Sequence, residues 1–246
     1  TAFEKKGEWY KLLDEAVGAS HWIDPVAEAE YEKALAELKV KQDAALGVKL
    51  GDNKPTVNLF VMSQCPYGVL AENALKPVID TLGNSVDFKL DFIANPSGDG
   101  FQSLHGQAEV DEDLRQVCAA KIAPTKYLNY IACQNKEVKN VGSNWEKCAT
   151  EAGIDKAALK TCAEGSEGKT LLLKSIELAN LLRVSGSPSI FVEGKQVNVD
   201  ITKPTAPSAF KSLICGAFDT PPKACEGVVT DVELPASGST VGCGAP

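Results

Sequence analysis

The sequence predicts an α/β protein in which a block of short helices interrupts the sheet and a helical extension precedes it. Three patterns predict this fold class. A strand, a helix and a second strand follow one another over residues 57–93. Helical patterns fill about residues 101–165, and two short strands with a tight turn occupy residues 189–199. Strands that alternate with helices in this way are typical of α/β folds.

Residues 1–54 are predicted to form an N-terminal helical extension. One helix is expected from Glu8 to Val17, and a longer one begins where Asp24 can cap the first turn and Pro25 takes the first helical position. The longer helix has an apolar face, which we expect to pack on the protein's own core, and a homodimer through the N-terminal helices is the alternative. This face consists of Ala27, Tyr31, Ala34, Leu35, Leu38 and Ala45.

The pattern changes to strand, helix and strand after residue 55. We expect strands at Val57–Met62 and Val86–Ile93 with a helix at Val69–Leu82 between them. A helix between two strands of this length predicts a parallel, right-handed crossover. The turn-forming residues from Asn95 to Gly100 predict a loop that closes the unit.

A block of short helices is expected next, and each of its helices contains one cysteine. A longer helix should follow at Lys169–Leu182, because apolar residues recur there at helical spacing. The four short helices are predicted at Asp111–Ala120, Pro124–Gln134, Asn144–Ala149 and Asp155–Ala163.

The last part of the fold is predicted as a hairpin and a helix. Ser189–Val192 and Gln196–Val199 read as strands around the glycine-containing turn at Gly194, and Ser208–Ala217 reads as a helix. We therefore expect a central domain over residues 55–226, with its helical insert at about 101–165, and a C-terminal tail over residues 227–246.

Charge and hydropathy exclude two classes of partner. A net charge of −8 and a pI near 4.9, without a block of basic residues, argue against nucleic acid and anionic membranes. No apolar run approaches the roughly 20 residues that span a bilayer. We expect protein or peptide partners.

The eight cysteines predict a disulfide framework. None shows the C-x2-C spacing of a zinc site, so we expect no metal and no cofactor. Disulfides indicate an oxidising compartment, which is periplasmic, extracellular or luminal. The chain starts at Thr1 without an initiator methionine or a signal peptide, so we expect that an export segment has been removed.

Cys65-Pro66-Tyr67-Gly68 is the main candidate for chemistry. An ordinary dithiol redox site reads C-x-x-C, and here Gly68 stands in the second place. Cys65 falls between a buried strand and the first turn of a helix, where unpaired backbone N–H groups favour a thiolate. Pro66 suits the first helical position. A reactive thiol is the favoured interpretation, and an inert buried cysteine is the alternative.

The order of elements resembles a thioredoxin-like fold with helices inserted in its middle. In proteins of that type a cis proline faces the active cysteine at the entry to the hairpin. The resemblance implies that the Ser187-Pro188 bond is cis and shapes a groove where a substrate strand lies beside Cys65.

The segment around His105 resembles the signature C-Q-H-G-x-x-E-C-x-x-N-x-x-x-x-C of the gamma-interferon-inducible lysosomal thiol reductases. The matching residues are His105, Gly106, Glu109 and Cys118. The departures are Ser103 and Val110 in place of two cysteines, Leu104 in place of glutamine and Asp113 in place of asparagine. The simplest account of the two absent cysteines is the loss of one disulfide. The resemblance spans about residues 56–226 and extends to DsbA-like bacterial proteins.

The family implies a thiol reductase that uses two cysteines on protein disulfides. Since this chain keeps only the first, we expect thiol–disulfide exchange on exported proteins, in the manner of an oxidoreductase or isomerase, through the single nucleophile Cys65. His105 is either close to the site or a loop histidine that holds a backbone carbonyl. A redox-silent binding module is the second hypothesis. Copper binding through Met62 and Cys65 is a third.

The other cysteines are interpreted as structural. Cys118, Cys133, Cys148 and Cys162 allow three pairings, and antiparallel neighbouring helices favour Cys133 with Cys148 and Cys118 with Cys162. Cys215 and Cys225 would close a short loop. Cys243 then remains as a candidate partner thiol for Cys65, and a free or intermolecular tail thiol is the alternative.

Overall fold

The computed structural model describes residues 2–6, 9–14, 19–23, 25–49, 53–184, 186–231 and 243–244. The chain forms two compact units, Thr1–Ala45 and Leu46–Pro246. The domain boundaries expected from the sequence stay a prediction.

The N-terminal unit contains a small antiparallel sheet where a helix was expected. Its strands are β1 (Ala2–Lys6), β2 (Trp9–Asp14) and β3 (Ala19–Ile23), in the order β1-β2-β3. The predicted helix from Glu8 to Val17 is therefore wrong. A short helix is marginal by itself, whereas β2 has a hydrogen-bonded neighbour on each side and begins with two aromatic residues that favour strands.

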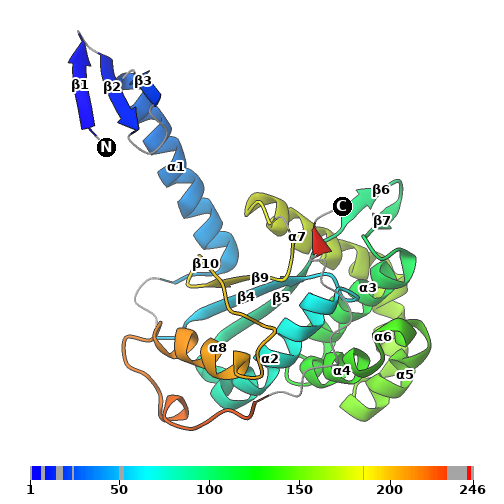
Figure 1. Ribbon diagram of the computed structural model, residues 1–246. Coiled ribbons are helices and arrows are strands. Elements are labelled where there is room, and N and C mark those ends of the chain that lie inside the picture. Colours follow the sequence, from blue (N-terminus) through cyan, green and yellow to red (C-terminus); the bar gives the residue numbers. More distant parts are fainter. Residues whose placement is uncertain are drawn as a thin grey trace. The chain divides into compact units, whose positions relative to one another are not determined.

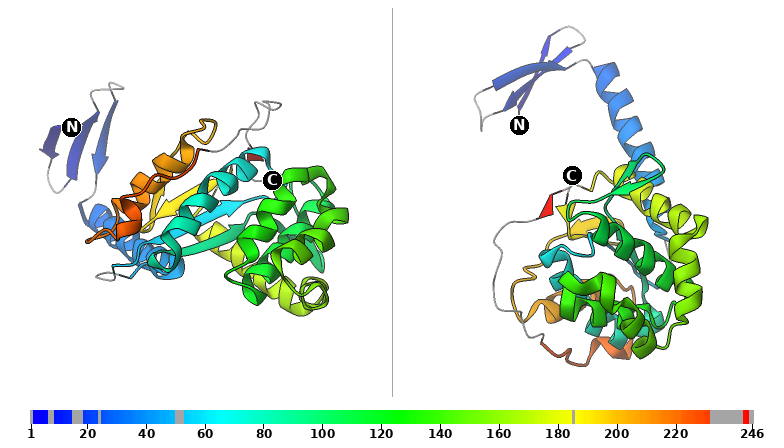
Figure 2. Two further views of the ribbon diagram at one scale, coloured as in Figure 1. Left: turned by 90° about the horizontal axis from the view of Figure 1, so that it is seen from below. Right: turned by 90° about the vertical axis from the view of Figure 1, so that its right-hand side faces the viewer.

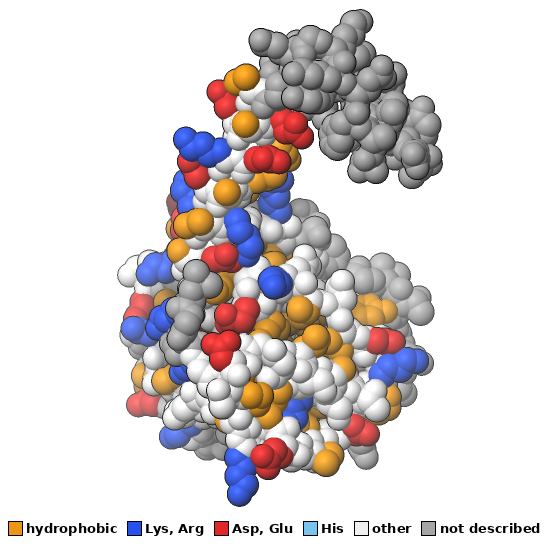
Figure 3. All heavy atoms as spheres, turned by 90° about the vertical axis from the view of Figure 1, so that its left-hand side faces the viewer, with side chains coloured by type: hydrophobic (Ala, Val, Ile, Leu, Met, Phe, Trp, Pro, Cys, Tyr) orange, Lys and Arg blue, Asp and Glu red, His pale blue; other side chains and the backbone are white. Residues whose placement is uncertain are grey.

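The second predicted helix of this unit is confirmed as α1 (Pro25–Leu46), and the predicted cap at Asp24 lies outside the described residues. Figure 3 shows hydrophobic, basic and acidic side chains interspersed along α1. Tyr31 and Leu35, from the expected apolar face, are 64% and 46% exposed. What this face packs against, and whether it forms a homodimer, stay predictions.

The larger unit is built on a four-stranded sheet in the order β10-β9-β4-β5 (Figure 1). The central strand β4 (Thr56–Val61) is buried throughout and runs parallel to β5 (Asp87–Phe92), with α2 (Pro66–Leu82) as the crossover between them. On its other side, β4 pairs antiparallel with β9 (Ser189–Val192), and β10 (Lys195–Val197) forms the edge. The predicted crossover and hairpin are both confirmed.

Helices cover both faces of this sheet (Figure 2). Side chains alternate along a strand, so Leu59 packs in the cluster that includes residues of α2 and α8 (Ala206–Cys215), while Phe60 lies in a second cluster with Ala179 of α7 (Ser166–Leu181). Phe60 also meets the ring of Phe191 edge-on, with 5.7 Å between ring centroids. Because both faces of β4 are covered, the strand is held in place, and its carboxyl end positions the start of α2.

The helical insert agrees with the sequence pattern, although the helices begin and end a few residues from the predicted positions. A 3-10 segment, Asn135–Asn140, joins its two middle helices. The helices of the insert and of the rest of this unit are α3 (Gln107–Ile122), α4 (Tyr127–Gln134), α5 (Val141–Ala152), α6 (Lys156–Glu164), α7 (Ser166–Leu181) and α8 (Ala206–Cys215).

Three disulfides lie among the described side chains, and all three match the favoured pairings. The first ties α3 to α6, the second ties α4 to α5, and the third joins the end of α8 to the 3-10 turn Lys223–Cys225. The pairs are Cys118–Cys162, Cys133–Cys148 and Cys215–Cys225.

Two segments that were expected to lack regular structure contain short strands. The predicted loop from Asn95 to Gly100 lies largely within a hairpin of β6 (Asn95–Ser97) and β7 (Gly100–Gln102), because Gly98 adopts a φ of +55° that permits a tight turn. In the predicted tail, β11 (Cys243–Gly244) pairs with β8 (Gly186–Ser187). None of the helices in the described ranges is long and apolar enough to cross a membrane.

Candidate active site

Cys65 is held at the junction between β4 and α2. It is the N-cap of α2, with φ −70° and ψ 121°, and Pro66 opens the helix. Its N–H donates to the carbonyl of Met62 at 2.9 Å, and its carbonyl accepts from the N–H of Val69 at 2.9 Å. The residue is fully buried, whereas Pro66 is exposed and Tyr67 is half-buried. The turn therefore holds Cys65 at the N-terminus of α2, as the sequence predicts.

The Ser187-Pro188 bond is cis and lies beside Cys65, which confirms the expected conformation. The Cys65 Sγ is 3.5 Å from the carbonyl oxygen of Ser187. The Ser187 Oγ accepts a hydrogen bond from the N–H of Met62 at 3.0 Å, and Ser189 Oγ donates to the carbonyl of Gly186. The fold thus brings together two motifs that lie more than a hundred residues apart.

Gly68 has a packing role that its sequence position does not reveal. A Cβ at this position would lie 2.8 Å from Ser187 Oγ and 3.1 Å from the carbonyl oxygen of Met62. Ser187 Oγ is itself held by the Met62 N–H, so it cannot simply turn away without losing that bond. A second cysteine three residues after Cys65 would require Ser187 Oγ to move away from the Met62 N–H.

Cys65 is disulfide-bonded in this structure, and none of the described cysteines is free. The three pairs given above do not include it. The strand next to it, β8, is also occupied, since the backbone of Cys243 pairs with that of Ser187 and Gly244 pairs with Gly186. The site therefore holds an oxidised sulfur beside a strand that already has a neighbour.

Two buried carboxyl groups of α3 hold the loop that leads into Cys65. Glu109 Oε2 accepts from the N–H of Gln64 at 2.9 Å, and Asp113 Oδ1 accepts from the N–H of Ser63 at 3.2 Å. Both acidic side chains are completely buried. They lie one helical turn apart, so a single face of α3 contacts two successive amides of the loop.

His105 reaches this loop through Glu109. Its Nδ1 lies 2.7 Å from Glu109 Oε2, and its backbone N–H donates to Glu109 Oε1. Ser103 Oγ also donates to Glu109, so this residue, which replaces a signature cysteine, forms a hydrogen bond. Val110, at the other replaced position, is buried. The signature residues His105 and Glu109 thus position the loop of Cys65.

The resemblance pointed to Glu109 but gave no role to Asp113 or Ser63. The signal that could have indicated Asp113 is a helix whose acidic residues fall on the same face as its apolar ones. Glu109, Glu112 and Asp113 are buried on α3 together with Val110 and Val117. Acidic side chains that must be buried need hydrogen-bond donors, and backbone amides of a loop supply them here.

Burial raises the pKa of several of these acids. The pKa of Asp113 lies well above its usual value because of desolvation first and repulsion from Glu109 second, while the bonds from Ser63 oppose the rise. On α2, desolvation raises the pKa of Glu72 to about 8, and the hydrogen bond from Asn135 opposes this. Carboxyl groups whose pKa is raised by burial therefore lie on both helices that flank the site.

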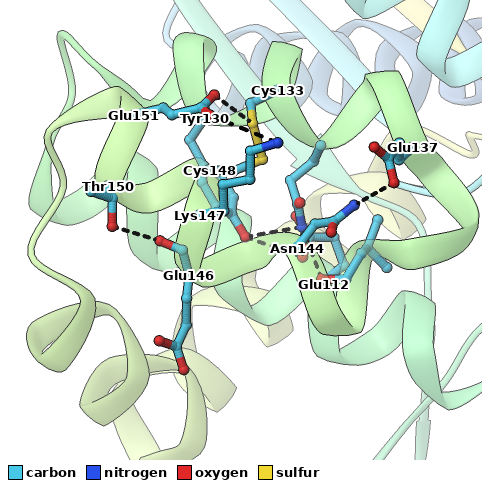
Figure 4. Close-up of a disulfide and its surroundings, with 12 residues drawn as sticks. Glu112, Tyr130, Cys133, Glu137, Asn144, Glu146, Lys147, Cys148, Thr150 and Glu151 are labelled. Atoms are coloured by element: carbon cyan, nitrogen blue, oxygen red, sulfur yellow. Dashed lines mark hydrogen bonds and ion pairs between the residues drawn. A yellow bond between two sulfur atoms is a disulfide. The ribbon is translucent and has the colours of Figure 1, made fainter.

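Another buried acid of α3, Glu112, bonds within the insert. Glu112 accepts hydrogen bonds from Arg115 at 2.8 Å and Gln134 at 2.9 Å, and Tyr130 donates to it at 3.2 Å. Figure 4 shows Glu112 and Tyr130 near the disulfide between Cys133 and Cys148. Since this carboxyl group is satisfied by residues of α3 and α4, it stabilises the insert.

The described residues contain no group of three or more His, Cys, Asp or Glu side chains that could hold a metal ion. Met62, which the copper hypothesis requires, is fully buried in the cluster of Phe60 and Ile93. Its position is explained by core packing.

One family model and several solved structures match this chain. Residues 56–152 match the model of "Gamma interferon inducible lysosomal thiol reductase (GILT)". No curated protein sequence matches the chain. The matched segment contains β4, the Cys65 motif and the signature around His105.

Three bacterial structures are similar in fold at low sequence identity. The reduced disulfide-bond oxidoreductase DsbG of Mycobacterium tuberculosis has a TM-score of 0.53 and 18% identity, covering 73% of this chain and 86% of that one. BdbD of Bacillus subtilis, in its oxidised form, has a TM-score of 0.51 and 16% identity, covering 73% and 92%. MdbA, a thiol-disulfide oxidoreductase of Actinomyces oris, has a TM-score of 0.51 and 14% identity, covering 68% and 83%.

These similarities confirm the thioredoxin-like α/β fold with a helical insert. Residues 56–152 match the GILT family model, and the chain shares its fold with the bacterial DsbG, BdbD and MdbA structures.

Proposed function

We propose that this protein carries out thiol–disulfide exchange on exported proteins, with Cys65 as the nucleophile. The observation that supports this most directly is the position of Cys65 Sγ at the start of α2, 3.5 Å from the carbonyl oxygen of Ser187, next to the cis Pro188. A sulfur at a helix start, beside an extended segment that can pair with another strand, is suited to attack a disulfide in a bound peptide.

The reaction begins once the disulfide of Cys65 is reduced. The positive end of the α2 dipole favours the thiolate, which is the form that attacks a disulfide sulfur. The substrate segment lies against Gly186 and Ser187, while Pro188 and Tyr67 flank it. Attack forms a mixed disulfide between Cys65 and one substrate sulfur, and the other substrate sulfur leaves as a thiolate.

An oxidising compartment agrees with this proposal. The described side chains form three disulfides in addition to the bonded Cys65, and such bonds persist in periplasmic, extracellular and luminal proteins. The matched family is named for a lysosomal thiol reductase, and MdbA is titled a thiol-disulfide oxidoreductase. Both names support the same chemistry for protein or peptide substrates.

Replacing Cys65 with serine tests the proposal. We expect Cys65→Ser to abolish insulin reduction and the refolding of a scrambled disulfide substrate, because no nucleophile remains at the start of α2. The matched control is the double variant Cys215→Ser/Cys225→Ser, which removes a disulfide outside the site and should keep the activity. A Cys65→Ser protein that works at the wild-type rate would rule out the assignment.

The complete burial of Cys65 favours one alternative, a binding module that uses the same groove without redox chemistry. Alkylation of the fully reduced protein separates the two functions. Fast modification of Cys65 under native conditions supports exchange, whereas a thiol that resists alkylation until the protein unfolds supports the binding module.

A further inference from the structure

The C-terminal strand β11 lies where a substrate strand would lie. Cys243 and Gly244 pair antiparallel with Ser187 and Gly186, directly before the cis Pro188. Strand addition to an exposed edge is a common way to bind an extended peptide, because the main chain supplies the hydrogen bonds. The edge that our proposed function assigns to a substrate is therefore occupied by the chain itself.

The register of this pairing brings Cys243 close to Cys65. Residues that face each other in an antiparallel pair have Cα atoms about 4.5 to 5.5 Å apart. Ser187 is the residue opposite Cys243, and its carbonyl oxygen is 3.5 Å from Cys65 Sγ. Cys65 and Cys243 are therefore both neighbours of Ser187, and a disulfide between them would require their Cα atoms to lie within roughly 4.4 to 6.8 Å of each other.

The cysteine inventory agrees with this register. The sequence contains eight cysteines, and six of them form the three pairs of the described side chains. Cys65 is disulfide-bonded as well, and Cys243 is the cysteine that remains.

We propose that Cys65 and Cys243 form one redox couple, in which the C-terminal strand supplies the second sulfur that Gly68 cannot supply. This inference rests on the proposed function and adds its resolving thiol. A Cβ at residue 68 would come within 2.8 Å of Ser187 Oγ, so a second cysteine there would displace that hydroxyl, while β8 already pairs with a strand that carries a cysteine.

A single turnover of the reduced protein balances by itself, and an external thiol must reduce the Cys65–Cys243 disulfide before each further turnover. In the reduced protein β11 leaves β8, and the Cys65 thiolate attacks a substrate disulfide, releasing one substrate thiolate. The Cys243 thiolate then attacks Cys65 Sγ, re-forms the Cys65–Cys243 bond and releases the second substrate thiolate. Two protein thiols are oxidised, one substrate disulfide is reduced, and the two thiol protons pass to the substrate thiolates. The reverse sequence oxidises a substrate dithiol.

Peptide mapping of the full chain under non-reducing conditions is the first test. We expect the peptide of Cys65 to be recovered linked to the peptide of Cys243. In the variant Cys243→Ser, Cys65 should change from fully protected to fully labelled by iodoacetamide after denaturation without reductant. The double variant Cys215→Ser/Cys225→Ser should keep Cys65 protected. A Cys65 peptide that is free, or linked to another cysteine, overturns the proposal.

A single turnover with a cyclic peptide disulfide is the second test. The reduced wild-type protein should release both peptide thiols, whereas reduced Cys243→Ser should stop at a covalent adduct between peptide and Cys65, visible by mass. Complete release by Cys243→Ser overturns the redox couple, even if Cys65→Ser is inactive and the proposed function holds. An active Cys65→Ser instead overturns the proposed function itself.

Discussion

The helical insert and the Cys65 loop are stabilised in different ways, although α3 belongs to both. In the insert, Cys118 and Cys133 are bonded to cysteines of other insert helices, and Glu112 is matched by the guanidinium of Arg115. In the loop, Ser63 and Gln64 are held by hydrogen bonds: their backbone amides donate to buried carboxyl groups that lie 45 to 50 residues further along the chain, and their side chains donate to the backbone carbonyls of Glu109 and Val138.

This difference indicates that the two halves of α3 have different roles. Its C-terminal half is anchored covalently, which fixes the helix against the rest of the insert. Its N-terminal half presents Glu109 and Asp113 to the amides before Cys65. Covalent anchoring therefore sets stability, and the hydrogen bonds set the geometry of the sulfur. The variants below test this separation.

The largest change in stability is expected from the double variant Cys118→Ala/Cys162→Ala. The bond spans 44 residues, so the chain-entropy relation gives a loss of about 4 kcal/mol in the free energy of unfolding. Urea denaturation measures this loss, and exchange activity at low temperature should persist because the Cys65 loop is not touched. The pair Cys133→Ala/Cys148→Ala, with a separation of 15, is the control and should lose about 3 kcal/mol. Equal losses in the two variants would contradict this ranking.

A smaller change in stability and a larger change in activity are expected from Glu109→Gln. The amide would place a donor group against donors from Gln64, His105 and Ser103, which costs about 1 to 3 kcal/mol. The exchange rate should fall because Gln64 precedes Cys65. The control is Asp111→Asn, an exposed residue of the same helix whose replacement should alter neither quantity. If Glu109→Gln loses stability at an unchanged rate, the loop does not depend on α3 for its geometry.

The smallest effect is the change in stability between pH 6 and pH 7 that Glu72 causes. Its pKa rises from 4.5 to about 8 in the folded protein because the carboxyl group is buried, so the native state keeps a proton that the unfolded state releases. Stability from this group is complete below about pH 4.5 and is lost as the pH rises toward 8, by at most about 1.4 kcal/mol per pH unit.

Glu72→Gln should remove this loss, so the difference in unfolding free energy between pH 6 and pH 7 becomes smaller than in the wild type. The exposed carboxyl group of Asp80, on the same helix, provides the control Asp80→Asn, which should keep the wild-type slope. A slope that Glu72→Gln leaves intact would assign the pH dependence to another group.

Local patterns predicted much of this structure. The hairpin at Gly194, the crossover helix α2 and the helices of the insert follow from periodicity and turn residues, and the nested disulfides follow from the order of those helices. The cis bond before Pro188 followed from the resemblance in element order.

The remaining features depend on contacts between distant residues, which periodicity does not encode. Trp9–Asp14 became a strand because β1 and β3 pair with it, not because of its own pattern. The role of Asp113 depends on an amide 50 residues earlier, and the position of Cys243 depends on a free edge at Ser187. Only the fold reveals such partners.

The close fit between Gly68 and Ser187 has a consequence for how this site can change by mutation. A cysteine at residue 68 alone would clash with Ser187 Oγ, and removal of that hydroxyl alone would leave the Met62 N–H without its acceptor. Either substitution by itself, a cysteine at residue 68 or the loss of the Ser187 hydroxyl, is therefore unfavourable. The two substitutions together avoid the contact with Ser187 Oγ. A change from the Cys65 site with Gly68 to a C-x-x-C site therefore involves substitutions at both residue 68 and residue 187.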